Sequence, residues 1–466
     1  MLRLYNTLTN AKEELKTVEE GVVRLYTCGP TVYDYAHIGN FRTFVFQDLL
    51  RRYLRFRGYR VIHVMNITDV DDRIIQNARE QGMSLEEYTA KYTAAFIEDS
   101  RTLRIELPEL MPRATDHIPE MVALIKKLEA NGYAYRRDGS IYFNISRFPG
   151  YGRLSKTDFR GIQTGARVDT DKYDKENARD FALWKAAKKG EVFWETEIGP
   201  GRPGWHIECS AMSMKYLGET FDIHCGGADL VFPHHENEIA QSEGATGKPF
   251  VRLWLHSEFL IVDGEKMSKS LGNQFTLRDI LAGGHSPEAI RYLLLSSHYR
   301  KQLNFTADGL RQAQASIQRL EDFLQRMSEV AVEEAPRPDF AEAVAGARRD
   351  LVEAMDDDLN TSAALAVVYD FIRSTYQRMD QQELGGGDAN AAIEFVRDLD
   401  GIFAVLPPEA ELVDDEILRK IEERSEARKR RDFAESDRIR DWLLAKGIRL
   451  EDTREGTRWK RVRSRT

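Results

Sequence analysis

Hydrophobic and polar positions change period twice within the first part of the chain. The run Val22–Thr27 is apolar and rich in β-branched residues, which predicts a buried strand that ends before Gly29. Apolar side chains then recur at helical spacing as far as Gly58, which stands where a left-handed C-terminal cap is expected. Arg60–Met65 predicts a second strand. Strand, helix and strand together predict a parallel sheet that binds its ligand at the carboxyl ends of the strands.

The later pattern predicts an insertion and a helical region. Ser84 and Glu87 form a capping box for a helix reaching about Arg104. A helix from about Ile118 is followed by a hairpin turned by Asp138-Gly139. From Pro287 helical periodicity dominates. We expect an α/β protein with a Rossmann-like parallel-sheet domain and a connective insertion, followed by an α-helical bundle and a small C-terminal module.

Composition narrows the class of protein. With 42% hydrophobic and 31% charged residues, the 466-residue chain has the composition of a soluble globular protein, and it contains no apolar run long enough for a membrane span. Its net charge of −9 argues against a protein that binds a polyanion such as DNA over much of its surface. The charge is compatible with RNA bound at a local basic face. Three cysteines and the lack of a signal peptide predict a reducing cytoplasm rather than a disulfide framework.

Two polar loops carry candidate nucleotide chemistry. His37-Ile38-Gly39-Asn40 opens the first helix, where free backbone N–H groups favour a phosphate. Lys266-Met267-Ser268-Lys269-Ser270 follows a strand-like run, and two lysines there can stabilise a departing pyrophosphate. Taken singly, the first loop also fits an ordinary helix cap and the second an exposed polar turn.

Possible metal ligands lie in three separate segments. Cys28 stands at the end of the first strand, and Cys209 follows Gly204-Trp205-His206-Ile207-Glu208. A helix predicted to begin at Pro233 would place His234 and Glu238 one turn apart on the same face. Two thiolates, an imidazole and a carboxylate are acceptable zinc ligands. Buried apolar cysteines and a helix-surface pair are the alternative interpretation, and periodicity alone does not bring the four together.

These motifs resemble those of a known family. The two polar loops, in this order, resemble the HIGH and KMSKS elements of class I aminoacyl-tRNA synthetases. The segments around Cys28, Pro203–Ser210 and Gly226–Glu238 look like the zinc-site segments of cysteinyl-tRNA synthetases. The resemblance implies that Cys28, Cys209, His234 and Glu238 bind zinc, whereas Cys225 matches no ligand position. We expect His224 and His235 to be hydrogen-bonded structural residues.

The resemblance also implies roles for the remaining site residues. The catalytic residues would be His37, Lys266 and Lys269. The ATP-binding set would be His37, Gly39, Asn40, Gly227, Asp229, Val262, Lys266, Ser268 and Lys269. The residues that bind the amino acid would be Gly29, Thr68, Trp205 and Asp229.

The implied activity is that of a cysteine–tRNA ligase. Such an enzyme activates L-cysteine with ATP and Mg²⁺ to cysteinyl-adenylate, releases pyrophosphate and transfers cysteine to the 3′ end of tRNA-Cys. Zinc would select the substrate thiolate, since a hydrophobic pocket discriminates poorly against the nearly isosteric serine. The family further implies a cytoplasmic monomer that binds neither DNA nor a membrane.

The same resemblance divides the chain into five parts. Residues 1–111 and 201–286 would form the two halves of the catalytic domain, and 112–200 the insertion that contacts the acceptor end of tRNA. Residues 287–406 would be the helical junction and bundle, and 407–466 the anticodon-binding module. In that module, a basic run from Arg424 to Arg431 and the aromatic Trp459 suit phosphate contact and base stacking. Charge alone would equally fit a solvated helix end.

Asn40 departs from the family pattern, which usually has His at the fourth position of HIGH. Two rival interpretations stay open, and Asn40 bears on the second of them. One is a ligase that joins cysteine to an amino sugar, although such enzymes lack the basic C-terminal module. The other is a non-catalytic tRNA-binding relative, against which Lys266 and Lys269 argue.

Overall fold

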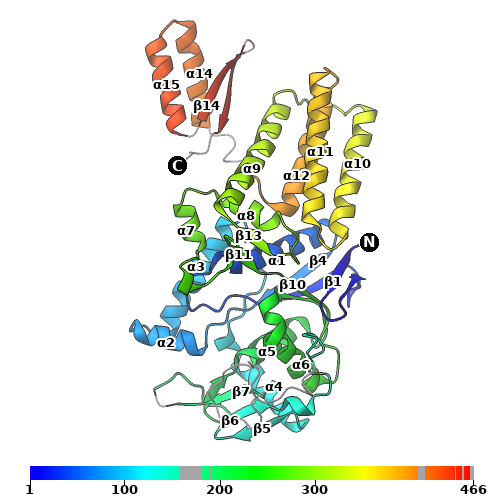
Figure 1. The fold of residues 1–466 in the computed structure, drawn as a ribbon, viewed down its shortest axis with the longest axis vertical. Coiled ribbons are helices and arrows are strands. Elements are labelled where there is room, and N and C mark those ends of the chain that lie inside the picture. The colour runs from blue at the N-terminus through cyan, green and yellow to red at the C-terminus, as the bar shows by residue number, and fades with distance from the viewer. Residues whose placement is uncertain (158–179, 189, 408–414, 447, 454–455, 462–466) are drawn as a thin grey trace.

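A computed structural model describes residues 1–157, 180–188, 190–407, 415–446, 448–453 and 456–461. The molecule is elongated (Figure 1): the insertion lies at one end, the central parallel sheet in the middle, and the helical bundle and C-terminal module at the other end. Across these ranges no helix combines the length and apolar character needed to cross a membrane.

The central sheet is parallel and has the strand order β10-β9-β3-β4. Its strands are β3 (Val22–Thr27), β4 (Arg60–Met65), β9 (Phe221–Gly227) and β10 (Val251–Ser257). Helix α1 (Ile38–Phe56) connects β3 to β4 and packs on the sheet. The predicted strand–helix–strand unit is confirmed. Its strands form because β-branched and apolar residues are buried on both faces, as in other parallel sheets.

The ends of α1 follow from local chemistry. His37 is the N-cap: its Nδ1 accepts the Asn40 N–H, while Asn40 Oδ1 accepts the His37 N–H, a reciprocal capping box. At the other end Gly58 has φ +85°, the left-handed conformation that glycine adopts at low cost.

The insertion is a small α/β unit of its own, and its sheet extends to Pro203, past the predicted boundary at residue 200. Asp138 (φ +50°) and Gly139 (φ +78°) form the predicted tight turn. Helix α4 packs beside the antiparallel sheet β5-β6-β7-β8. These elements are α4 (Ile118–Ala130), β5 (Ala134–Arg137), β6 (Ser140–Phe143), β7 (Phe181–Ala186) and β8 (Gly201–Pro203). Between β6 and β7 the sequence from Ser155 to Asp180 is polar, and most of it lies outside the described residues.

Four further helices are α2 (Asp72–Glu80), α3 (Leu85–Thr102), α5 (Trp205–Leu217), which packs against β3 and β4, and α6 (Glu236–Thr246). The prediction that Pro233 opens the last of these was wrong. Pro233 lies in the wide turn η4 (Val231–His235), preceded by Phe232 in an extended conformation, and α6 begins only at Glu236. Phe232 (φ −138°, ψ 131°) interrupts the helical backbone at this point, and the regular α-helical hydrogen-bond ladder starts only at Glu236.

A second small sheet leads into the loop Lys266–Ser270, called the lysine-rich loop below. Strands β12 (Glu265–Lys266), β11 (Leu260–Val262) and β13 (Leu303–Phe305) form this sheet, in that order. Helices α7 (Leu277–Ala282) and α8 (Pro287–Leu295) lead from this sheet toward the bundle.

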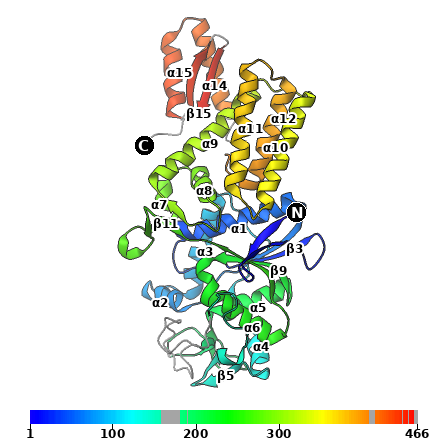
Figure 2. The same cartoon turned by 45° about the vertical axis from the view of Figure 1, so that its right-hand side comes forward.

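Beyond α8 the chain is largely helical (Figure 2). The bundle comprises α9 (Ala307–Ser328), α10 (Pro338–Asp356), α11 (Thr361–Asp380) and α12 (Gly386–Phe403). A linker of residues 329–337 joins α9 to α10, and Pro338 is the first residue of α10, where a missing N–H costs nothing. The C-terminal module pairs two helices with a hairpin: α14 (Asp415–Lys429), α15 (Phe433–Ala445), β14 (Ile448–Thr453) and β15 (Gly456–Arg461).

Candidate active site and metal centre

A cavity of about 550 Å³ opens at the carboxyl ends of the central strands, beside the start of α1. The position agrees with the rule for ligand sites in parallel sheets. Ten of the residues singled out in the sequence line it: Cys28, Gly29, His37, Asn40, Thr68, Trp205, Cys209, Gly227, Asp229 and His234.

A line of hydrogen bonds runs from Gly29, which lines the cavity, to Glu208. A Cβ on Gly29 would lie 1.8 Å from the Asn66 carbonyl oxygen, so only glycine fits there. The Gly29 N–H donates to Asn66 Oδ1 (3.0 Å), and Asn66 Nδ2 donates to Thr68 Oγ1 (3.0 Å). The Thr68 hydroxyl in turn donates to Glu208 Oε2 (3.1 Å). This line links the segment of Cys28 to the helix that carries Cys209.

Cys28, Cys209, His234 and Glu238 come together in the fold. One ligand atom from each lies within 4.8 Å of the others, and all four side chains are buried. The two sulfurs are 4.0 Å apart, and His234 Nε2 is 3.0 Å from Glu238 Oε1. Two sulfurs, one nitrogen and one oxygen at this spacing fit a zinc ion. A second group, Cys28, His224, His235 and Glu238, overlaps the first.

Burial and close charges set the pKa values in this cluster. Burial, with the nearby Cys209, raises the pKa of Cys28 well above its usual range. Burial opposes ionisation of Cys209 as well, but hydrogen bonding from Cys28 and the charge of His234 lower its pKa to about 6. Although burial favours the neutral imidazole, Cys209 and Glu238 raise the pKa of His234 to about 10. Burial likewise favours a neutral Glu238, yet His224 and His234 lower its pKa to about 2.

Each of three candidate ligands has its own imidazole partner. His206 Nδ1 lies 2.9 Å from His234 Nδ1, His224 Nε2 lies 3.0 Å from Glu238 Oε2, and His235 Nε2 lies 3.3 Å from Cys28 Sγ. Outer partners of this kind orient metal ligands.

The sequence did not predict that His206 would be a hydrogen-bond partner of a candidate ligand. It also did not predict His256, whose Nε2 lies 2.7 Å from His235 Nδ1. Both positions carried a usable signal. His206 precedes Cys209 by one helical turn, and His256 stands at the carboxyl end of a strand, where binding residues gather.

Trp205 forms part of the cavity wall. It is the first residue of α5, and its side chain is 38% exposed. Its ring centroid lies 4.2 Å from that of His234, with the planes at 33°. An exposed indole beside a candidate metal ligand presents an apolar face to a small bound molecule.

At the other end of the cavity, the start of α1 meets the lysine-rich loop. The Ile38 N–H donates to the Phe275 carbonyl (2.9 Å), and His37 pairs with Thr276 in an isolated β-bridge. Met267 packs against Gly39, where a Cβ would come within 2.7 Å of the methionine Cε.

The remaining predicted nucleotide residues are less directly placed. Gly227 and Asp229 line the cavity, and burial raises the pKa of Asp229. Val262 is buried in β11, Lys266 is exposed, and Ser268 donates its N–H to Asn273 Oδ1 (2.8 Å). These three are not among the residues that line the cavity. The side chain of Lys269 lies outside the described part of the chain.

The parallel sheet and the site at its carboxyl edge agree with the comparisons. Residues 14–315 match the family model of tRNA synthetases class I (C) catalytic domain, and residues 351–406 match the DALR domain. Methionyl-tRNA synthetase of Mycobacterium tuberculosis, solved with methionyl-adenylate, has the same fold, with a TM-score of 0.63 at 13% identity, over 89% of this chain and 96% of that one. The fold and the catalytic-domain match define a class I tRNA synthetase, as the sequence predicted.

Full-length relatives specify the family. The chain is 57% identical over 463 residues to cysteine--tRNA ligase of Solibacter usitatus, covering 99% of both chains. It is 51% identical to that of Koribacter versatilis, again over 99% of each. The chain belongs to the cysteine--tRNA ligase family.

Proposed function

We propose that this protein activates L-cysteine with ATP and Mg²⁺ and then esterifies the 3′-terminal ribose of tRNA-Cys. The observation that carries the proposal is the convergence of two thiols, an imidazole and a carboxylate beside the cavity that Gly29, Thr68 and Trp205 line. The relatives of this length carry the name of that activity.

Cys28, Cys209, His234 and Glu238 would hold zinc, with the substrate thiol approaching through the cavity. The fit rests on the donor set, since thiolates and imidazole suit zinc better than magnesium or calcium. A zinc ion in this position would supply affinity for the sulfur of cysteine, whereas the hydroxyl of serine offers no sulfur to bind. That affinity provides discrimination that pocket shape alone does not.

The amino-acid end of the cavity orients the rest of the substrate. Thr68 and the Gly29 backbone would bind the main-chain groups of cysteine, and Trp205 would cover its apolar side. Asp229, a carboxylate lining the cavity, would bind the α-ammonium group or a ribose hydroxyl. The hydrogen bonds from Gly29 to Asn66 and from Thr68 to Glu208 hold these groups in place before substrate arrives.

The nucleotide end would catalyse adenylate formation. The cysteine carboxylate attacks the α-phosphate, the bond to the β-phosphate breaks, and pyrophosphate leaves with its negative charge. His37, Lys266 and Lys269 would stabilise that charge, while Gly39, Asn40, Gly227, Val262 and Ser268 would shape the ATP site. The ribose hydroxyl of tRNA then attacks the carbonyl carbon, and AMP leaves.

The other parts of the chain would position tRNA. We assign 1–111 and 201–286 to the catalytic domain, 112–200 to the acceptor end, 287–406 to the junction and bundle, and 407–466 to the anticodon. The protein would act as a monomer. Three free, buried cysteines suit the cytoplasm, where thiols stay reduced.

The test is ATP-dependent attachment of labelled cysteine to bulk tRNA by the zinc-loaded protein. We expect charging that requires ATP, is lost in Cys209→Ser together with bound zinc, and persists in Cys225→Ala. Cys225 is a matched control, because it is equally buried but belongs to neither donor group. Cysteine-dependent pyrophosphate exchange without charging would point to an acceptor other than tRNA. Absence of both reactions would contradict the proposal.

A further inference from the structure

Three hydrogen bonds in series connect the N-terminal segment to Cys28. Thr7 Oγ1 lies 2.8 Å from His256 Nδ1, His256 Nε2 lies 2.7 Å from His235 Nδ1, and His235 Nε2 lies 3.3 Å from Cys28 Sγ. The four residues come from four separate parts of the fold. Thr7 follows β1 (Arg3–Asn6), His256 lies in β10, His235 precedes α6, and Cys28 follows β3.

The donor and acceptor in each of these three hydrogen bonds follow from Cys28, the last residue of the series. This step rests on the proposed function, in which Cys28 is a metal-bound thiolate and therefore only accepts. His235 must then donate from Nε2, and a neutral imidazole has a single N–H, so His235 Nδ1 accepts from His256 Nε2. By the same reasoning His256 Nδ1 accepts from the Thr7 hydroxyl. Both imidazoles are buried, at 0% and 7% exposure, which favours their neutral forms.

We propose that Thr7 is a positioning residue for the metal centre: its hydroxyl donates to His256 Nδ1 and so stabilises the orientation and the Nε2–H tautomers of His256 and His235, which direct an N–H at the Cys28 sulfur. Thr7, at the other end of this series of hydrogen bonds, is itself held in place. Its N–H donates to the carbonyl of Trp254 (2.9 Å), which lies two residues from His256 on the same strand. A donated hydrogen bond fixes the thiolate in place and offsets part of its charge.

The overlapping donor group provides a clear alternative. If His235 Nε2 itself bound the metal, together with Cys28, His224 and Glu238, it would carry no proton there. His235 Nδ1 would then donate to His256 Nε2, His256 Nδ1 would donate to Thr7, and every hydrogen bond would reverse. Tautomers therefore distinguish the two arrangements.

The first measurement is the nitrogen-15 NMR spectrum of the histidine-labelled, zinc-loaded protein. Our proposal requires the Nε2–H tautomer at both His235 and His256. Nδ1–H tautomers at both positions would overturn it.

The second measurement compares zinc affinity, by competition with a chromogenic chelator, in Thr7→Val, Thr7→Ser and Thr9→Val. Direct outer partners of metal ligands are typically worth about 10–100-fold in affinity, so we expect a loss of about 3–10-fold for the more distant Thr7→Val. Thr7→Ser keeps the hydroxyl and should stay within about twofold of the parent protein. Thr9→Val removes a hydroxyl of the same loop that contacts Asn6 and Glu13 instead, and it should also bind as the parent does.

The outcomes separate the two proposals. A parent protein that binds no zinc would overturn both. Normal zinc binding with equal affinities in the parent and Thr7→Val, or an equal loss in Thr9→Val, would overturn the role of Thr7 and leave the metal centre standing.

Discussion

Met267 of the lysine-rich loop lies directly against Gly39 in the first turn of α1: a Cβ added to Gly39 would come within 2.7 Å of Met267 Cε and 3.1 Å of His37 Cε1. The His37–Asn40 motif and the Lys266–Ser270 motif, which lie far apart in the sequence, are therefore in contact. The Met267 side chain occupies the space that a side chain at Gly39 would need. Together with the hydrogen bond from Ile38 to Phe275 (2.9 Å), this contact holds the loop beside the start of α1.

Gly39→Ala should separate stability from activity. Alanine favours a helix over glycine by about 0.5–1 kcal/mol, so the melting temperature should hold or rise. The added methyl group displaces Met267 and His37, however, and we expect cysteine-dependent pyrophosphate exchange to slow by about tenfold, or roughly 1.4 kcal/mol.

Relief of the contact supplies the control for Gly39→Ala. The double variant Gly39→Ala, Met267→Ala should recover part of the lost rate, because the methyl group then has room. Exchange at the parent rate in Gly39→Ala would show that the contact has no catalytic consequence.

Asn40 accepts the His37 N–H through Oδ1 (3.1 Å) and thereby completes the helix cap. If Asn40 also performs the role of the histidine that the family usually has at this position, Asn40→His should leave the rate of pyrophosphate exchange within about tenfold of the parent. Asn40→Ala loses the half of the capping box that Asn40 Oδ1 supplies but keeps the bond from the backbone N–H of residue 40 to His37 Nδ1, so its melting temperature should fall by the equivalent of less than about 1 kcal/mol. A change in activity of several hundredfold in Asn40→His would contradict the idea that asparagine has taken over the role of the usual histidine.

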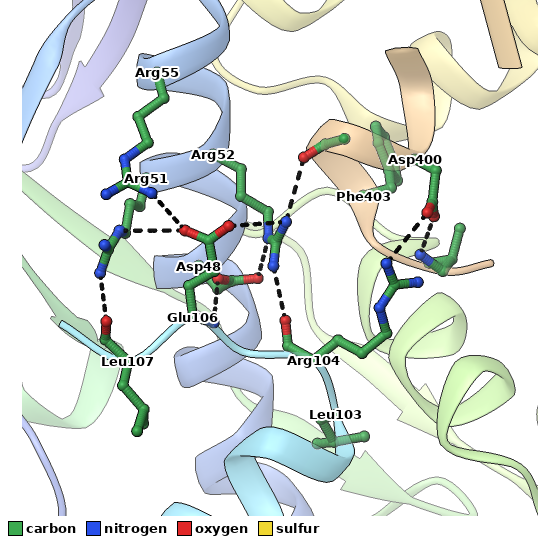
Figure 3. Close-up of polar contacts among 12 residues, drawn as sticks. Asp48, Arg51, Arg52, Arg55, Leu103, Arg104, Glu106, Leu107, Asp400 and Phe403 are labelled. Atoms are coloured by element: carbon green, nitrogen blue, oxygen red, sulfur yellow. Dashed lines mark hydrogen bonds and ion pairs between the residues drawn. The ribbon is translucent and has the colours of Figure 1, made fainter. Parts of the chain in front are cut away.

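A buried ion pair joins α1, which carries Asp48, to α8, which carries Arg291. Arg291 Nη2 lies 2.5 Å from Asp48 Oδ2, and Arg291 also donates to the carbonyls of Phe403 (2.6 Å) and Leu103 (2.9 Å). Figure 3 shows the surroundings: Asp48 and its arginine neighbours on α1 face the loop after Leu103 and the end of α12.

Arg291→Met should destabilise the protein by about 3–5 kcal/mol, since it leaves a buried carboxylate short of a cation and two carbonyls without a donor. Denaturant unfolding measures the effect. Arg55→Met is the matched control on α1: Arg55 is 42% exposed and pairs with Glu106 and Glu109, and its loss should cost less than about 1 kcal/mol. Similar losses in both variants would contradict the distinction.

Zinc binding should release protons and strengthen as pH rises. At pH 8 the metal-free cluster keeps a proton on Cys28, whose pKa lies well above its usual range, and on His234, whose pKa is about 10. Cys209 and Glu238, with pKa values of about 6 and about 2, are already ionised. Since ligands bind zinc deprotonated, about two protons should be released at pH 8, and affinity should fall as pH falls. Calorimetry in buffers of different ionisation enthalpy counts these protons, and a pH-independent affinity would contradict the assignment.

Local sequence determined much of this protein. The bounds of β3 and β4 follow from runs of apolar residues, the start of α3 from the Ser84–Glu87 capping box, and the hairpin turn from Asp138-Gly139. Each depends on interactions between residues a few positions apart, which composition and spacing record directly. The family motifs indicated the candidate ligands, and comparison with relatives confirmed the class and the family.

Tertiary structure alone decided how distant residues meet. It brought Cys28 and Cys209 to within 4.0 Å of each other, surrounded the candidate ligands with imidazoles, and buried Arg291 against Asp48. It also moved the start of α6 past Pro233. No local pattern encodes these contacts, because their energy comes from excluding water between segments that lie far apart along the chain and become neighbours only when the sheet and its helices pack together.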